Sequence, residues 1–145
     1  MNTRIMVRGK GANTGNWYYG TYFCHRPYMP SPMGEDREKW ENETKHYIIF
    51  QQSSDWGLPY TDVQVVVDPT TLGQCTGHHI KGKWLYEGDI VKLDPKSDDL
   101  YTVVWVSERG SWFFKCDDAY DYLIQDLLKY AEIVGNIYDG LERKD

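Results

Sequence analysis

The chain has 145 residues, enough for one domain with a sizeable core, and its 22 acidic and 16 basic side chains give a net charge of −6. That balance argues against tight nonspecific binding to nucleic acid, because such binding depends on neutralising phosphates. The first residues lack the apolar run of a signal peptide, and no apolar run approaches the ~20 residues of a membrane helix. Three scattered cysteines do not make a disulfide framework and favour a reducing compartment, so we expect a cytoplasmic protein without a membrane partner.

Alternating side chains predict a β-hairpin at the start of the chain. Residues 3–8 and 17–24 alternate with a period of two, and a glycine-rich turn at 9–16 lies between them. Both faces of the second strand are apolar, which a hairpin with one wet face would not tolerate. Either the rest of the chain covers the second face or another subunit does, and most soluble oligomers are homo-oligomers.

The same hairpin combines basic and aromatic side chains. Exposed rings with nearby cations hold single-stranded nucleic acid by stacking and by phosphate contacts. The net negative charge weighs against this function, so nucleic acid is the alternative partner and not the favoured one. The side chains that we single out for contact with nucleic acid or another partner are Arg4, Arg8, Lys10, Trp17, Tyr18, Tyr22 and Arg26.

The middle of the chain changes composition and then returns to strands. Residues 25–45 contain three prolines and a charged run, which predicts a loop within which a short helix can form at 37–43. Strands are expected at 46–51 and 62–67, joined by the turn SSDWGLP.

The stretch Gly77-His-His-Ile-Lys-Gly82-Lys83 has the spacing of a phosphate-binding loop. Trp84 stands where that loop needs Ser or Thr, and a turn and a strand follow where it needs a helix, so we reject nucleotide binding here. Glycine reaches positive φ at low cost, which suits tight turns. We expect an exposed turn tip at 81–83 and a second turn before a strand at 90–93. The residues assigned to this turn motif are Gly73, Gly77, Gly82, Gly88 and Asp89.

The C-terminal part predicts a second hairpin and then a change of period. Residues 100–106 and 111–116 are the hairpin strands. Residues 119–130 place apolar side chains at the spacing of an amphipathic helix, and 132–138 is a last strand. Short strands separated by turns favour a small barrel or a folded-over sheet.

Neither a metal site nor a catalytic site is favoured. Cys75 and His78, with Cys116 or His46, have no zinc-ligand spacing, and a buried cysteine beside a solvated polar turn is the better interpretation. The carboxylates of Glu87 and Asp89 flank a glycine, where an aspartate accepts turn hydrogen bonds. We therefore predict no catalytic residue, no cofactor and no metal.

Several motifs together resemble the YopX family of phage and prophage proteins. They are Thr71-Leu-Gly-Gln-Cys-Thr-Gly77, Gly82-Lys83, Tyr86-Glu-Gly-Asp-Ile-Val91, Tyr101-Thr-Val-Val-Trp105 and Val134-Gly-Asn-Ile-Tyr138. The resemblance covers nearly the whole chain. It implies a small, mostly β protein with an SH3-like or related barrel element, encoded by a phage or prophage, and it supplies no activity.

These observations lead to one set of expectations. The fold is mainly β, with an N-terminal hairpin sheet, an SH3-like or related barrel or folded sheet in the C-terminal half, and a short amphipathic helix near the C-terminus. Residues 1–145 form a single domain, which can divide into lobes at 1–67 and 68–145. The function is that of a non-enzymatic accessory binding module in the host cytoplasm, self-associating as a homo-oligomer or binding a phage or host protein.

Overall fold

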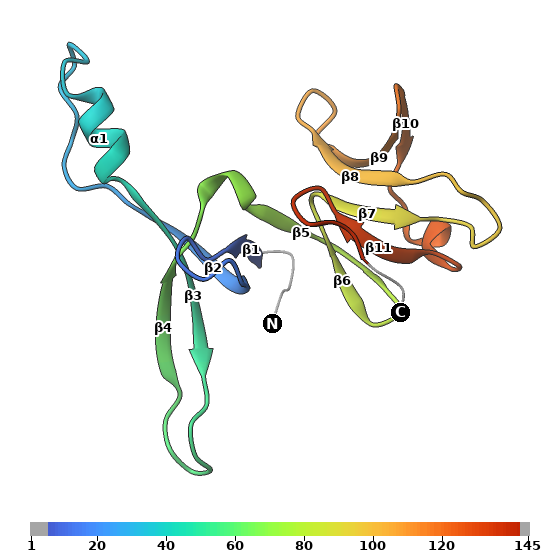
Figure 1. Ribbon diagram of the computed structural model, residues 1–145, viewed down its shortest axis with the longest axis horizontal. Coiled ribbons are helices and arrows are strands. Elements are labelled where there is room, and N and C mark those ends of the chain that lie inside the picture. The colour runs from blue at the N-terminus through green and yellow to red at the C-terminus, as the bar shows by residue number, and fades with distance from the viewer. Residues whose placement is uncertain (1–5, 143–145) are drawn as a thin grey trace. The chain divides into compact units, whose positions relative to one another are not determined.

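The computed structural model describes residues 6–142, which form two compact units, one of residues 6–72 and one of residues 73–142 (Figure 1). We call them the N-terminal and C-terminal units. Both are built mainly of antiparallel strands, which confirms the mainly β prediction. None of the helices among residues 6–142 is long and apolar enough to cross a membrane.

The N-terminal unit is an antiparallel sheet in the order β4-β3-β2-β1. Its strands confirm the predicted hairpin and the two strands after it, although residues 3–5 of the first predicted strand lie outside the described residues. The short helix α1 occupies the predicted 37–43. The elements are β1 (Val7–Lys10), β2 (Trp17–His25), α1 (Arg37–Glu43), β3 (Lys45–Gln52), β4 (Thr61–Val66) and the 3₁₀ turn η2 (Pro69–Thr71).

The segment that follows β4 anchors β1. The Lys10 backbone N–H donates to Thr71 Oγ1 at 2.8 Å, and the Thr71 hydroxyl donates to the Asp68 carbonyl at 2.7 Å. Asp68 caps η2, because its carboxylate accepts the Thr70 hydroxyl at 2.8 Å and the Thr70 N–H at 3.0 Å, and these two bonds lower the pKa of the Asp68 carboxyl. The hydrogen bonds at η2 therefore hold the end of β1 in place.

The C-terminal unit begins with a β5–β6 hairpin and continues as a sheet in the order β10-β9-β8-β7-β11-β12. The order ends at β10 and β12 without pairing between them among residues 73–142, so this is an open sheet and not a closed barrel. The elements are β5 (Gly73–Ile80), β6 (Lys83–Tyr86), β7 (Asp89–Lys92), β8 (Tyr101–Val106), β9 (Ser111–Cys116), β10 (Ala119–Tyr122), the 3₁₀ turn η3 (Gln125–Leu128), β11 (Glu132–Asn136) and β12 (Gly140–Leu141).

The core of the C-terminal unit is made of apolar side chains from most of its elements. Removing these side chains from water is the main stabilising contribution to such a unit. The buried cluster consists of Ile80, Leu85, Val91, Val103, Phe114, Leu123, Leu128 and Ala131.

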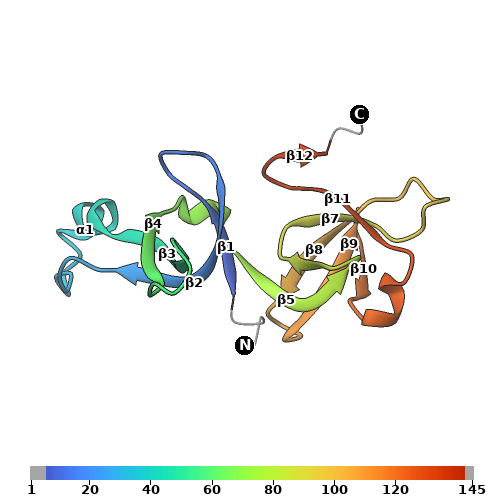
Figure 2. The same ribbon diagram turned by 90° about the horizontal axis from the view of Figure 1, so that it is seen from below.

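The predicted amphipathic helix at 119–130 is wrong. The chain turns at Asp117, with φ of 52°, and β10 then pairs with β9 so that Tyr122 lies opposite Phe113. Tyrosines favour strands when a neighbouring strand offers an edge to pair with. Only the short turn η3 follows before β11 (Figure 2), and Leu123 and Leu128 still reach the core.

The glycine turn motif is confirmed in part. Gly82 and Gly88 lie in turns with φ of 81° and 88°, and β6 follows the first turn where a phosphate-binding loop would need a helix. Gly73 and Gly77 instead lie within β5, Gly77 at a shift of register, so their assignment to turns is wrong. His78 and His79 also belong to β5 and not to a polar turn. The two histidines are in a strand because β5 continues to pair with β6 beyond the register shift at Gly77.

Candidate functional site

The strand pairing of the C-terminal unit places side chains from β8, β9 and β10 in one row. Val104 lies opposite Phe113, and Phe113 lies opposite Tyr122. Because side chains alternate along a strand, Lys115 and Tyr120 form the next row on the same face. The three strands therefore build a surface that combines aromatic rings with a lysine.

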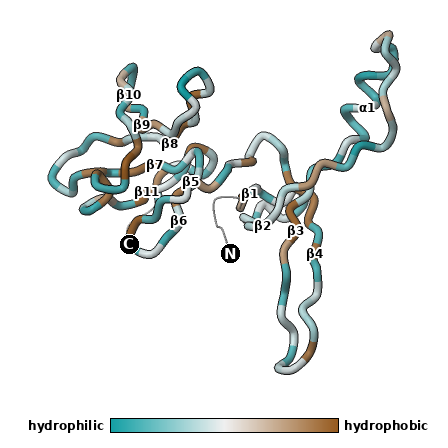
Figure 3. The backbone as a smooth tube through the Cα atoms, turned by 180° about the vertical axis from the view of Figure 1, so that it is seen from behind, coloured by the Kyte–Doolittle hydropathy of each residue, from teal (hydrophilic) through white to brown (hydrophobic). Residues whose placement is uncertain are grey.

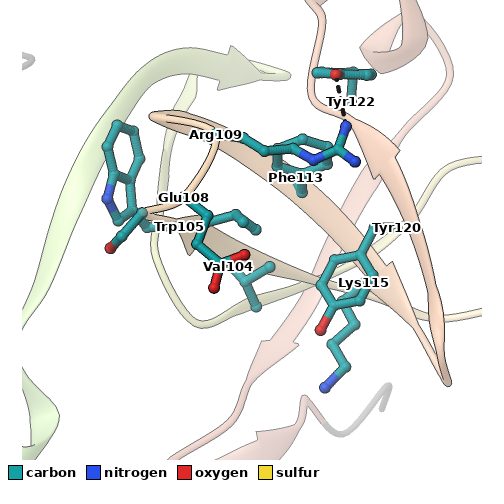
Figure 4. A pocket seen from close by; sticks show the side chains of 10 residues that line it. Val104, Trp105, Glu108, Arg109, Phe113, Lys115, Tyr120 and Tyr122 are labelled. Atoms are coloured by element: carbon teal, nitrogen blue, oxygen red, sulfur yellow. Dashed lines mark hydrogen bonds between the residues drawn. The ribbon is translucent and has the colours of Figure 1, made fainter.

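A pocket of about 620 Å³ opens on this face (Figure 4). The turn between β8 and β9 closes one side of it, and that turn is fixed by backbone bonds from Arg109 to Val106 at 3.1 Å and from Gly110 to Ser107 at 3.2 Å. We call this site the aromatic pocket. It is lined by Val104, Trp105, Val106, Ser107, Glu108, Arg109, Phe113, Lys115, Tyr120 and Tyr122.

Phe113 is the buried aromatic residue of the pocket. Its ring centroid lies 4.5 Å from that of Tyr122, in a tilted arrangement, and 6.4 Å from that of Tyr120, edge to face. Both tyrosines are exposed. Rings at these separations attract one another beyond their buried area, so the aromatic groups support each other's positions.

Two cations lie on the rings of this pocket. Arg109 donates to the Tyr122 hydroxyl at 3.1 Å, and its guanidinium lies 5.9 Å from the centre of Phe113 (Figure 4). The Lys115 ammonium lies 5.6 Å from the centre of Tyr120. Glu108 is the one acidic residue among those that line the pocket. The pocket therefore offers exposed rings, two cations and one carboxylate, which suits a ligand with a flat apolar group and an anionic group.

The basic aromatic residues predicted on the N-terminal hairpin do not form one surface. Arg8 is 5% exposed, and its guanidinium lies 4.7 Å from the ring centre of Trp17. The Lys10 ammonium lies 5.6 Å from the same ring. The pairing of β1 with β2 places these residues on one face, as the two-residue period requires. Burial removes Arg8 from contact with a phosphate in solution.

The other residues of that prediction lie elsewhere. Tyr18 stacks on Phe50 with ring centroids 5.9 Å apart, on the opposite face of β2. Tyr22 shares a hydrogen bond of 2.6 Å with His46 and stacks on its ring, and partial burial raises the pKa of Tyr22. Arg26 is exposed just after β2, and Arg4 lies outside the described residues. The structure thus brings Arg8, Lys10 and Trp17 together and separates them from the tyrosines.

The candidate metal ligands have other contacts. Cys75 is buried, which raises the pKa of its thiol, and His78 Nδ1 shares a hydrogen bond of 3.0 Å with Gln125 Oε1. His79 packs edge to face on Trp84. No group of three or more His, Cys, Asp or Glu side chains that could hold a metal occurs within residues 6–142.

Asp89 has a structural position. Its carboxylate is buried and accepts the Tyr86 backbone N–H at 2.8 Å, across the turn that contains Gly88. This is the turn hydrogen bond that the sequence predicts for an aspartate at the start of a strand.

Sequence reasoning missed the aromatic pocket. It predicted β8 and β9 as a hairpin but placed Tyr120 and Tyr122 on a helix, so the third strand of the surface was lost. The available signal was the alternation of Tyr120 and Tyr122 with a period of two, directly after a predicted strand.

The architecture is that of a mainly β protein with an aromatic pocket on an open antiparallel sheet. A family model described as YopX protein matches residues 15–143, so the chain belongs to the YopX family. A search of the curated proteins finds no match to the chain.

Proposed function

We propose that this YopX-family protein is a non-enzymatic binding module that self-associates. The observation that carries the proposal is the aromatic pocket, where two cations lie on the rings of Phe113 and Tyr120 and leave exposed tyrosine surface at the rim. Convergent rings and fixed polar groups are typical of recognition sites. As the family resemblance implies, we place it among accessory proteins that phages or prophages encode, acting in the host cytoplasm.

The reactive side chains support a role in binding and not in catalysis. Burial raises the pKa of Cys75, and partial desolvation raises that of Cys116, so neither thiol is activated as a nucleophile. The carboxylate of Asp89 holds a turn, and His78 is held by Gln125. These groups contribute to the fold.

Self-association is supported by the exposed aromatic side chains of the N-terminal unit. Tyr19 and Phe23 lie exposed on one face of β2, as the apolar pattern on both faces of that strand predicts. Exposed apolar patches mark interaction sites, and a second copy of the same chain is the commonest partner. An unidentified phage or host protein is the other partner that this surface would suit.

The test is the molar mass in solution, measured by light scattering and sedimentation velocity from low to high micromolar concentration. We expect a mass above that of the monomer, which falls on dilution. A monomer at every concentration would contradict self-association.

Single-stranded nucleic acid is the competing function, supported by Lys10 beside Trp17 and by the exposed Arg26. If the protein binds nucleic acid, the same samples would bind a labelled oligonucleotide, and this binding would weaken steeply with salt. The Lys10→Ala/Arg26→Ala variant would lose this binding.

A further inference from the structure

The turn between β3 and β4 presents an aromatic side chain that has no cover. Trp56 is fully exposed at 104%, and Leu58 and Tyr60 beside it are 59% and 67% exposed. Figure 1 shows this turn at the end of a long hairpin, and Figure 3 shows a hydrophobic segment close to its tip. We call residues 53–60 the arm tip.

The arm tip is an ordered turn. Strand pairing continues up to Gln52 opposite Thr61, and the Leu58 N–H donates to the Asp55 carbonyl at 3.1 Å. Gly57 takes a φ of 83° inside this turn. The hairpin therefore holds the backbone that carries Trp56, which lowers the backbone entropy lost on binding and favours association.

The chemistry of the arm tip matches that of the aromatic pocket. An indole has a flat apolar face and one N–H donor, and the pocket offers the exposed ring of Tyr120 and the carboxylate of Glu108. Asp55, next to Trp56 in sequence, carries a carboxylate, which is opposite in charge to Lys115 and Arg109 of the pocket. The pocket volume of about 620 Å³ leaves room for a side chain of this size.

We propose that the arm tip of one protomer binds in the aromatic pocket of a second copy of the chain. Trp56 packs against Tyr120 and donates its N–H to Glu108, while Asp55 pairs with Lys115 or Arg109. This inference rests on the self-association proposed above, because it names the surfaces that make the contact.

Such an interface is heterologous, since each protomer gives one surface and receives a different one. Heterologous contacts form rings if the rotation closes and open chains if it does not. They also allow two defective chains to complement each other, which a contact between two identical surfaces such as the exposed face of β2 does not. Complementation therefore distinguishes this proposal from other modes of self-association.

The experiment uses Trp56→Ala as the arm variant and Tyr120→Ala as the pocket variant. The matched control is Tyr130→Ala, because Tyr130 is exposed like Tyr120 (66% and 51%) and also carries a lysine on its ring, at 5.4 Å against 5.6 Å. Tyr130 does not line the pocket. Circular dichroism checks that each variant is folded.

We expect the arm variant and the pocket variant each to weaken self-association by roughly 30-fold or more, the loss typical of a central aromatic side chain in an interface. The control leaves self-association unchanged. An equimolar mixture of the two variants forms a 1:1 complex, because the first keeps its pocket and the second keeps its arm tip. The Trp56→Ala/Tyr120→Ala double variant binds neither of the two single variants.

A charge exchange tests the polar part of the contact. Asp55→Lys alone and Lys115→Glu alone are each expected to weaken association, and the chain that carries both is expected to recover part of it. Recovery identifies these side chains as partners, because a merely structural defect in either would add to the other.

The outcomes separate the two proposals. Self-association that Trp56→Ala leaves intact would overturn the arm contact and keep the proposed function. A wild-type protein that is monomeric throughout would overturn both. If Trp56 is shielded from a fluorescence quencher in the monomer, its own chain covers it, and the contact between copies is wrong. Oligonucleotide binding that is lost in Tyr120→Ala but kept in Trp56→Ala would assign the pocket to nucleic acid instead.

Discussion

Gly82 and Gly88 offer a direct test of the conclusion that glycines shape the turns of this segment. Both have left-handed φ angles, of 81° and 88°. Their surroundings differ, because a Cβ added at Gly82 would meet nothing within 4 Å, whereas at Gly88 it would lie 3.3 Å from Ile137 Cγ1 and 3.3 Å from Tyr138 Cε2. Alanine at the two positions therefore separates the cost of the backbone from the cost of crowding.

The expected magnitudes follow from these two terms. A left-handed conformation costs an L-residue about 1–2 kcal/mol of folded-state free energy. Replacing glycine by alanine offsets about 0.4–1 kcal/mol of this cost, because alanine restricts the unfolded chain. Gly82→Ala should therefore lower the free energy of unfolding by about 1 kcal/mol. Gly88→Ala also requires Ile137 and Tyr138 to shift by a few tenths of an ångström, so its loss should exceed that at Gly82 and reach about 2 kcal/mol in total.

The assay is urea-induced unfolding followed by tryptophan fluorescence and circular dichroism. Both glycines lie in the C-terminal unit, so the same transition reports both variants, and an unchanged slope with urea shows that stability alone has changed. Equal losses at the two positions would refute the crowding argument. No loss at Gly82 would show that the turn adopts another conformation at no cost, which would refute the role of glycine there.

Two further predictions concern buried polar groups. Asp89→Ala should lower the free energy of unfolding by about 2–3 kcal/mol, because it removes a charge-assisted hydrogen bond to the Tyr86 N–H. Asp89→Asn keeps an acceptor oxygen and should lower the free energy of unfolding by less. Equal losses for the two variants in urea unfolding would count against this hydrogen bond. Burial raises the pKa of the Cys75 thiol above its ordinary value of 9.0, so the folded state holds this proton more tightly than the unfolded state. The stabilising contribution of the protonated Cys75 thiol is therefore present at neutral pH and lost as pH rises above about 9. Cys75→Ala should make the unfolding free energy decline less steeply at alkaline pH. An unchanged slope of unfolding free energy against pH would contradict this prediction.

The strands were predictable because the local pattern and the final pairing agree. Apolar side chains alternate within residues 100–106 and 111–116, and both stretches are rich in β-branched and aromatic residues. The observed β8 begins one residue later than predicted, and β9 has the predicted bounds. The helix α1 was predictable from a charged run that places Arg37 and Glu41 one turn apart, where their side chains meet at 3.1 Å.

The region after β9 was not predictable because its periodicity suits two structures. Apolar side chains between 119 and 130 lie at helical spacing, yet only Leu123 and Leu128 of that set are buried. Residues 119–122 instead pair with the edge of β9, because the two-residue turn at 117–118 brings them back beside it. The periodicity alone does not decide between helix and strand, and the deciding feature is this tight turn directly after a predicted strand.

The aromatic pocket depends on the same pairing of β10 with β9. Arg109 lies in a turn whose position the sequence does predict, but its partner Tyr122 reaches it only through the pairing of β10 with β9. The Walker-type spacing shows the opposite case, in which a local motif was correctly rejected from its context. A motif carries chemical meaning only when the elements around it deliver the backbone geometry that the chemistry requires.

The small core of the N-terminal unit gives an independent physical reason for association. Within residues 6–72, the hydrophobic side chains that are buried are those of Ile48 and Val67, whereas Tyr19, Phe23 and Trp56 are exposed. A unit of this size buries a smaller fraction of its surface on folding than a larger domain does, and such units usually need a further source of stability. A partner that covers these rings would supply apolar burial that the chain does not provide, because each aromatic residue brings a large apolar area to an interface. We therefore expect contacts between molecules to cover the exposed aromatic rings of this unit, as the proposed self-association requires.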